Sequence, residues 1–132
     1  MYIGKVIKFL KFVFHISIFL LIVISLYPGS LFGYLFYGDL TQQPNIINNP
    51  IGTTINHLIY YFYVSILGLF LHLRNKNFNK ILYGLLFLSV VLEVLQYIVP
   101  NRTFQLVDLI GNFMGVVIAY FFIKLYLFFN ES

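Results

Sequence analysis

The chain has 132 residues, of which 61% are hydrophobic and only 9% charged, and its formal net charge is +4. With a mean hydropathy of +0.91, this composition excludes an ordinary water-soluble protein and indicates a membrane protein. A nucleic-acid-binding protein is also excluded, because the basic residues lie between apolar runs, where cations anchor helices. Cysteine does not occur, which rules out disulfides, thiolate metal sites and cysteine nucleophiles.

Four apolar runs are predicted to be membrane-spanning helices, because a helix satisfies every backbone amide within one segment. The runs cover approximately residues 6–27, 57–73, 81–99 and 107–129. Pro28-Gly29 ends the first run and Pro100 ends the third. A long polar and aromatic connection, approximately residues 28–56, follows the first run. Within it, the stretch SLFGYLFYG, residues 30–38, is expected to lie as a cap on the outer membrane surface.

The first run has an alternative interpretation as a secretory signal peptide, with Lys5, Lys8 and Lys11 as its basic end. We disfavour this alternative because no A-x-A-like cleavage site follows and three more spans come after.

The basic residues orient the predicted helices. If the chain crosses the membrane four times, one side receives seven of them: Lys5, Lys8, Lys11, Arg74, Lys76, Lys80 and Lys124. The positive-inside rule assigns that side to the cytoplasm and leaves only Arg102 outside. We therefore predict an all-α integral membrane protein, a bundle of four transmembrane helices with both termini cytoplasmic. Residues 1–132 form a single domain in this prediction, since no linker or repeat divides them.

Three of the predicted helices carry a stripe of polar and small residues, because positions 100° apart along a helix recur on one face. The stripes are Ser89, Glu93 and Gln96 with Pro100; Asp108, Asn112, Gly115 and Ala119; and His57, Tyr61, Ser65, Gly68 and His72. Gly111 and Gly115 also form a G-x-x-x-G pattern, which lets a second helix approach closely.

Glu93 is the deepest of the polar residues near the outer helix ends, since it lies seven residues before Pro100 and therefore roughly 10 Å below the helix end. An acidic side chain near mid-bilayer costs on the order of 2.5–3.5 kcal/mol, so it should face the bundle and have a partner. The available cations are His57 and Arg102, and we expect Glu93 to approach one of them. His15, in the inner half of the first run, is expected to have a structural role.

The polar residues also resemble a known family. The pattern E-x-x-Q-x-x-x-P-x-R-x(5)-D-x(3)-N-x-x-G is similar to the signature of the VanZ-like membrane protein family, and it occurs here at Glu93, Gln96, Pro100, Arg102, Asp108, Asn112 and Gly115. His57 and Tyr61 are similar to the family's H-x-x-x-Y element, so the resemblance covers about residues 53–119. Where the family often has Asp-Lys, this chain has Thr53 and Thr54, which argues against a mechanism that needs a second carboxylate beside the His.

The resemblance implies a small multi-spanning protein of the bacterial cytoplasmic membrane, and the family's namesake is associated with resistance to glycopeptide antibiotics of the teicoplanin class. The outer helix ends are expected to bring together a ligand-binding or functional cluster: His57, Tyr61, Glu93, Gln96, Arg102, Asp108 and Asn112. Its expected partner is a membrane lipid, a lipid-linked cell-wall precursor or the glycopeptide drug. No cofactor or metal is expected, because one His with two carboxylates makes a weak metal site.

Three functional classes remain open from the sequence. We prefer a non-catalytic envelope protein that binds such a ligand and changes antibiotic access. The second class is an intramembrane enzyme acting on a lipid headgroup or lipid-linked precursor, with His57 or Glu93 as acid or base and Arg102 holding a phosphate. The third is a transporter, which a single four-helix unit disfavours unless it forms a homo-oligomer. Each polar residue also has a purely structural alternative as interhelical hydrogen-bonding glue.

Overall fold

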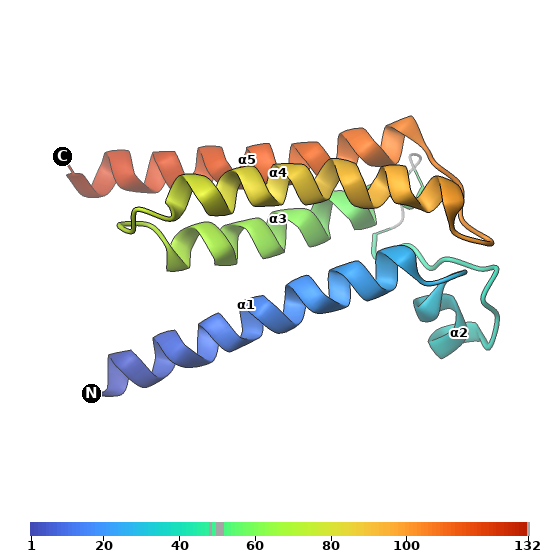
Figure 1. Ribbon diagram of the computed structural model, residues 1–132, viewed down its shortest axis with the longest axis horizontal. Helices are drawn as coiled ribbons and strands as arrows, with labels where there is room; N and C mark the ends of the chain where they lie inside the picture. The colour runs from blue at the N-terminus through green and yellow to red at the C-terminus, as the bar shows by residue number, and fades with distance from the viewer. Residues whose placement is uncertain (48, 50–51, 132) are drawn as a thin grey trace.

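The computed structural model describes residues 1–47, 49 and 52–131. In these residues the only regular secondary structure is helical (Figure 1). The long helices are α1 (Tyr2–Leu26), α3 (Thr54–Leu71), α4 (Phe78–Leu95) and α5 (Leu106–Glu131), while α2 (Leu31–Tyr37) is short and the 3-10 turn Gln96–Ile98 extends α4. The four long helices are long and apolar enough to cross a membrane. Their ends lie within four residues of the predicted ends, so the hydropathy prediction is confirmed.

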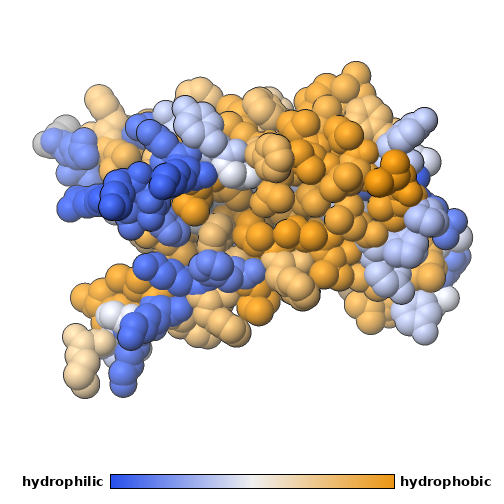
Figure 2. Space-filling view, viewed as in Figure 1, coloured by the Kyte–Doolittle hydropathy of each residue, from blue (hydrophilic) through white to orange (hydrophobic). Residues whose placement is uncertain are grey.

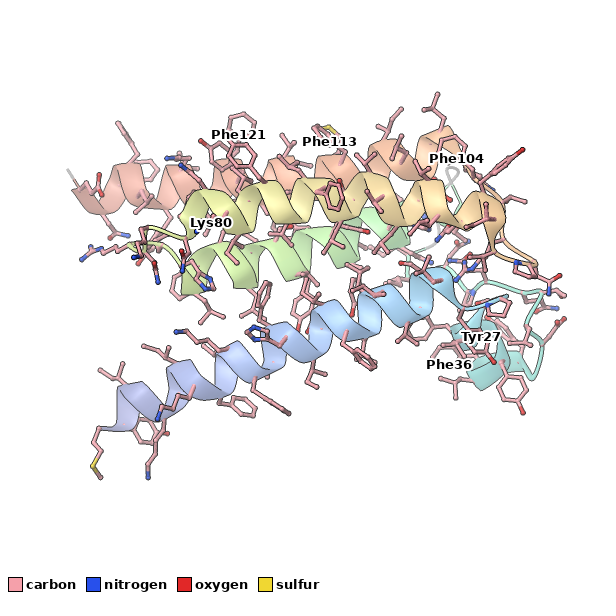
Figure 3. The ribbon with its side chains drawn as sticks, in the orientation of Figure 1. Tyr27, Phe36, Lys80, Phe104, Phe113 and Phe121 are labelled. Atoms are coloured by element: carbon pink, nitrogen blue, oxygen red, sulfur yellow. The ribbon has the colours of Figure 1, made fainter. Side chains whose placement is uncertain are left out.

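The helices run alternately up and down, which places both termini and the α3–α4 turn at one end of the molecule (Figure 1). At that end, the Lys124 ammonium lies 5.7 Å from the centroid of the Phe78 ring. The surface shows an apolar band with hydrophilic residues at the terminal end (Figure 2). Within the band, Phe113 and Phe121 point outward from α5 (Figure 3). Such an exposed apolar belt is the surface expected of a helix bundle in lipid.

Glycines bring α3 and α5 together over the most extensive helix pairing of the bundle. A Cβ atom on Gly115 would lie 2.6 Å from the Leu58 carbonyl oxygen, and one on Gly111 would lie 3.0 Å from the Thr54 carbonyl oxygen. Only glycine permits backbones to approach so closely. The close approach predicted from the G-x-x-x-G pattern is therefore confirmed.

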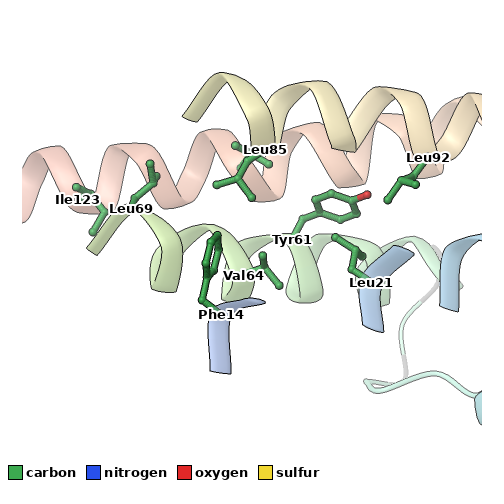
Figure 4. Close-up of a cluster of buried hydrophobic side chains, with 9 residues drawn as sticks. Phe14, Leu21, Tyr61, Val64, Leu69, Leu85, Leu92 and Ile123 are labelled. Atoms are coloured by element: carbon green, nitrogen blue, oxygen red, sulfur yellow. The ribbon is translucent and has the colours of Figure 1, made fainter. Parts of the chain in front are cut away.

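The second half of α1 packs on this unit, whereas the first half diverges from it (Figure 1). Phe14, Ser17 and Leu21 are buried, and residues 2–13 contain no buried position. Figure 4 shows Phe14 and Leu21 reaching the core that Val64 and Tyr61 help to form. α1 is thus anchored to the bundle by its second half, which leads to the end of the molecule opposite the termini.

The connection after α1 contains the short helix α2, which forms within the stretch expected to be a surface cap. Ser30 caps its N-terminus by accepting a hydrogen bond from the Gly33 amide at 2.9 Å. Gly38 ends it in the left-handed conformation, with φ of 66°. Most of its large side chains are exposed, including Tyr34, Leu35 and Phe36. Figure 3 places Phe36 and Tyr27 together at the end opposite Lys80.

Candidate functional site

His57, in the first turn of α3, contacts an amide side chain on α5. Its Nδ1 atom lies 2.9 Å from Asn112 Oδ1. The Asn112 amide nitrogen in turn donates to the Ser89 carbonyl and to Glu93 Oε2, both at 3.3 Å. Because the amide nitrogen faces two acceptors, the amide oxygen is the group that accepts from His57. The hydrogen therefore resides on His57 Nδ1 in the neutral ring.

Two carboxylates lie near the His57 ring, one close to each nitrogen. Glu93 Oε2 is 4.0 Å from Nδ1, and Asp108 Oδ2 is 3.7 Å from Nε2. The side chain of His57 is 15% exposed while that of Glu93 is completely buried. The expectation that Glu93 approaches His57 or Arg102 is confirmed for His57. Among the described residues, Arg102 forms no ion pair with Glu93.

Both carboxylates also have uncharged partners. Glu93 Oε1 accepts from the Gln105 backbone amide at 3.3 Å, and Asp108 Oδ1 accepts from the Thr54 hydroxyl at 2.6 Å. Asp108 lies in the first turn of α5, where the helix dipole stabilises a negative charge. Thr54, one of the two residues that depart from the family pattern, is thus a direct partner of Asp108.

Arg102 and Gln96 bind the end of α1. The Arg102 Nε and Nη2 atoms donate to the carbonyls of Tyr27 at 3.1 Å and Ile24 at 2.5 Å. The Gln96 amide donates to the Ser25 carbonyl at 3.0 Å. The last carbonyls of a helix have no partners within it, so these donors satisfy them and fasten α1 to the end of α4.

The Arg102 guanidinium is a partly buried cation whose charge has no close counterpart. Burial lowers its pKa from the ordinary value, while the more distant carboxylates of Glu93 and Asp108 oppose that shift. Within the part of the chain that the structure describes, no carboxylate oxygen lies within 4.0 Å of it. Only two of its five N–H donors are used by the carbonyls of α1.

A cavity of about 390 Å³ adjoins His57 and Arg102. Its walls come from the second half of α1, from α2, from residues 43–46, and from the first turns of α3. The lining residues are Leu21, Ile24, Ser25, Phe32, Phe36, Gln43, Pro44, Asn45, Ile46, Asn56, His57, Tyr60, Tyr61, Gln96 and Arg102. Apolar side chains thus surround a small polar surface, which is the usual character of a small-molecule pocket.

All seven residues of the expected cluster lie at the end of the bundle opposite the termini, in two layers. His57, Tyr61, Gln96 and Arg102 line the cavity. Glu93, Asp108 and Asn112 do not line it; all three are buried and lie next to the nitrogens of the His57 ring. The contacts described for the outlying histidine His15 are both with its own helix: a hydrogen bond to the Lys11 carbonyl at 2.6 Å and an edge contact with the Phe14 ring.

Sequence reasoning missed three contributors to this site. Thr54 appeared only as a departure from the family pattern, although its position three residues before His57 places it on the same helix face. Asn56 fixes the cavity wall by donating to the Pro44 carbonyl at 2.7 Å and accepting from the Ile46 amide at 2.9 Å. Tyr60 lines the cavity and donates to the Ser17 carbonyl at 3.1 Å. No periodicity in the sequence marks these long-range contacts.

Among residues 1–47, 49 and 52–131, no group of three His, Cys, Asp or Glu side chains is placed to hold a metal ion. The chemistry available is hydrogen bonding and charge, supplied to the cavity by an imidazole and a guanidinium.

Comparison with known proteins gives one family and no individual relative. A search of curated proteins and a search of solved structures find no significant match. The family model described as VanZ/LLP1 matches residues 3–129, which is nearly the whole chain and includes every residue of the cluster. The chain therefore belongs to the VanZ/LLP1 family.

Proposed function

We propose that this protein acts at the bacterial cell envelope by binding the polar end of a membrane amphiphile in the cavity beside His57 and Arg102. By occupying that cavity, a lipid or lipid-linked cell-wall precursor would change how glycopeptide antibiotics of the teicoplanin class reach their target, and susceptibility would fall. The observation that supports this most directly is the cavity itself, with apolar walls and a guanidinium and an imidazole in its lining.

Charge favours an anionic group on the ligand. Neither carboxylate of the cluster lines the cavity, and both already have hydrogen-bond partners, Glu93 with Gln105 and Asp108 with Thr54. Among the described residues, the Arg102 guanidinium lines the cavity without a close carboxylate and has donors that no described hydrogen bond uses. A partly buried cation gains most from an anionic partner, and a guanidinium matches phosphate or carboxylate geometry. A phosphate or carboxylate head on an apolar tail fits this lining.

The proposed orientation places this cavity at the outer leaflet. The seven basic residues near the termini favour the cytoplasm for that end, and the cavity lies at the opposite end, beside α2. Lipid-linked wall precursors and glycopeptides meet at the outer leaflet, so both are within reach of a cavity there.

The experiment is to express the protein in a susceptible bacterium and measure the growth-inhibiting concentration of teicoplanin. Arg102→Ala and Glu93→Gln should each abolish protection, the first by removing the anion contact and the second by removing the charge next to His57. His15→Ala is the matched control and should keep protection. Membrane levels of every variant are measured by immunoblot. Full protection by well-expressed Arg102→Ala and Glu93→Gln proteins would refute the proposal.

One observation favours catalysis as the second candidate function. The His57 side chain lines the cavity, and among the described residues its Nε2 atom makes no hydrogen bond, since Asp108 Oδ2 is 3.7 Å away; a basic nitrogen beside the cavity is the group that such catalysis would use. An enzyme of this kind would modify a lipid headgroup or a lipid-linked precursor, with His57 as general base and Arg102 on the phosphate. Lipid and muropeptide profiles of cells with and without the protein separate the candidates. A new covalent species supports the enzyme, whereas unchanged chemistry with reduced drug binding supports the binder.

A further inference from the structure

Charged groups are scarce in the lining of the cavity beside His57 and Arg102. Among the described residues that line it, Arg102 is the only lysine or arginine, and aspartate and glutamate do not occur. Glu93 and Asp108 lie outside this lining and have partners within the protein. The cavity therefore has one permanent cation for an anionic group and no carboxylate for a cationic group.

Two neutral amide side chains lie at the mouth of the cavity. Gln43 and Asn45 both line it and are exposed, and their side chains make no hydrogen bond among the described residues. Asn56 holds this segment in place by donating to the Pro44 carbonyl at 2.7 Å and accepting from the Ile46 amide at 2.9 Å. A side-chain amide has both donors and acceptors, which suit the hydroxyl groups of an uncharged polyol.

The polar and apolar parts of the lining are ordered by depth. α1 runs toward this end of the molecule (Figure 1), so Leu21 lies about one turn deeper than Ile24, whose carbonyl accepts from Arg102. α3 begins at this end, so Tyr60 lies about one turn deeper than His57. A lipid with its head beside Arg102 and His57 thus has the start of its chains at the level of apolar lining.

The cavity is small. Its volume of about 390 Å³ is near the lower end of the range for small-molecule pockets, roughly 300–1,000 Å³. A phosphate with a small polyol fits such a volume, whereas a disaccharide with an attached peptide does not.

We infer that this cavity selects a lipid whose head is a single phosphodiester with an uncharged, hydroxyl-bearing group, the chemistry of phosphatidylglycerol. Such a lipid would be the amphiphile of the proposed function, on which this inference rests. Its phosphate takes the unused donors of Arg102, and its hydroxyl groups bond to Gln43 and Asn45. A choline or ethanolamine head brings an ammonium group that meets no carboxylate. A diphosphate brings a second phosphate that meets no second guanidinium.

The chain contains no tryptophan, so a single introduced tryptophan reports on one position. Phe32→Trp places the reporter in the cavity lining, where Phe32 is 42% exposed. Phe113→Trp is the matched control, because Phe113 is 40% exposed and points outward from α5, away from the cavity (Figure 3). Both proteins are reconstituted into phosphatidylcholine vesicles that contain a minor fraction of one lipid with brominated chains. Bromine quenches a tryptophan that it contacts, and the ratio of quenching by two lipids with the same chains cancels the effect of depth.

The tryptophan at position 32 should prefer brominated phosphatidylglycerol over brominated phosphatidylcholine or phosphatidylethanolamine by about fivefold, the size expected from one basic residue near the surface. The tryptophan at position 113 should be quenched equally by all three. Adding Arg102→Gln should abolish the preference at position 32, and Arg102→Lys should keep part of it. Arg74→Gln, which removes the same charge from the opposite end, should leave it unchanged.

Phosphatidylmethanol tests the hydroxyl groups, because it has the charge of phosphatidylglycerol without the glycerol hydroxyls. The reporter at position 32 should prefer phosphatidylglycerol over phosphatidylmethanol by about twofold to fivefold, as one net hydrogen bond provides. In a protein with Gln43→Ala and Asn45→Ala the two lipids should quench equally. A preference that survives both substitutions would contradict the assignment of the hydroxyl groups to these amides.

Equal quenching of position 32 by phosphatidylglycerol, phosphatidylethanolamine and phosphatidylcholine would overturn the inference, as would a preference that persists in Arg102→Gln. Farnesyl diphosphate is the competitor in a final measurement. If a small fraction of it relieves quenching by brominated phosphatidylglycerol at position 32, the cavity prefers a diphosphate, so the inference fails while the proposed function stands. If no brominated lipid quenches position 32, no amphiphile enters the cavity and both fail.

Discussion

Asn112 joins His57 to Glu93: its side-chain oxygen faces His57 Nδ1 at 2.9 Å, and its nitrogen faces Glu93 Oε2 at 3.3 Å. One amide on α5 thus contacts polar groups of both α3 and α4. These contacts satisfy hydrogen-bonding groups of an imidazole and a carboxylate where the three helices meet. Low polarity around such a network strengthens its hydrogen bonds and makes an unpaired member costly.

Asn112→Leu, which has a similar size and no hydrogen-bonding group, should lower the free energy of unfolding by about 2–4 kcal/mol. The loss arises because His57, Glu93 and the Ser89 carbonyl each lose a partner while they remain buried. The measurement is the loss of helical circular dichroism during titration of detergent micelles with dodecyl sulfate. An unchanged midpoint would show that the amide contributes nothing to the assembly of the bundle.

Two buried serines should respond oppositely to alanine. Ser89 donates to the Leu86 carbonyl at 2.6 Å, so Ser89→Ala should cost about 0.5–1.5 kcal/mol. The Ser65 hydroxyl is buried without a hydrogen-bond partner among the residues described, so Ser65→Ala should be neutral or stabilise by up to about 1 kcal/mol. The same denaturation assay compares them. A larger loss for Ser65→Ala than for Ser89→Ala would contradict the hydrogen-bond assignment.

Two glycine-to-alanine substitutions should distinguish the effect of close helix packing on stability from the effect of helix propensity. Gly115→Ala puts a methyl group 2.6 Å from the Leu58 carbonyl oxygen, so α3 and α5 must move apart, at a cost of about 1–3 kcal/mol. Gly84→Ala has nothing within 4 Å and should stabilise α4 by up to about 1 kcal/mol, because alanine favours helix. If both variants unfold at the same denaturant concentration, the α3–α5 contact is not as close as described.

The helices and the polar stripes were predictable because both follow from local periodicity. A run of about twenty apolar residues has no stable alternative to a helix in lipid. Scarce polar residues that recur at helical spacing must face the protein, as Glu93, Asp108 and Asn112 do. The VanZ-like pattern selected the same residues, since it contains the inward-facing positions of α4 and α5.

The partners within the site were not predictable, because they depend on how helices from distant parts of the chain meet. Arg102 was expected to approach Glu93 or to hold a ligand phosphate, yet its described hydrogen bonds are to two carbonyls of α1, more than seventy residues away. The hydrogen bond from Thr54 to Asp108 depends on the packing of α3 against α5, which local sequence patterns do not predict. The divergence of α1 was likewise not predicted, because apolar residues such as Ile7 and Leu10 continue the packing face into the half that leaves the bundle, even though Lys5, Lys8 and Lys11 lie in that half.

The orientation of the bundle is a separate prediction. Both termini should be cytoplasmic, because they share one end of the molecule with the α3–α4 turn (Figure 1), and seven of the eight Lys and Arg residues are there. Alkaline phosphatase and green fluorescent protein fusions at each terminus measure this directly. Phosphatase activity at either end would reverse the topology and move the cavity to the inner leaflet.

Replacing Arg102 by lysine and by glutamine should separate its two roles. Lysine keeps the positive charge but has a single ammonium, so it cannot reach two carbonyls with the fixed geometry of a guanidinium. Glutamine keeps one amide donor for α1 and loses the charge. If the cavity binds an anion, Arg102→Lys should retain part of the teicoplanin protection, whereas Arg102→Gln should lose it at equal membrane levels. If Arg102 serves only to fasten α1, the protection given by the variants should instead rank in the order of their unfolding stability. A stable Arg102→Gln protein would then still protect. Measuring protection and denaturation midpoints on the same three proteins therefore shows whether the charge or the hydrogen bonds to α1 matter for function.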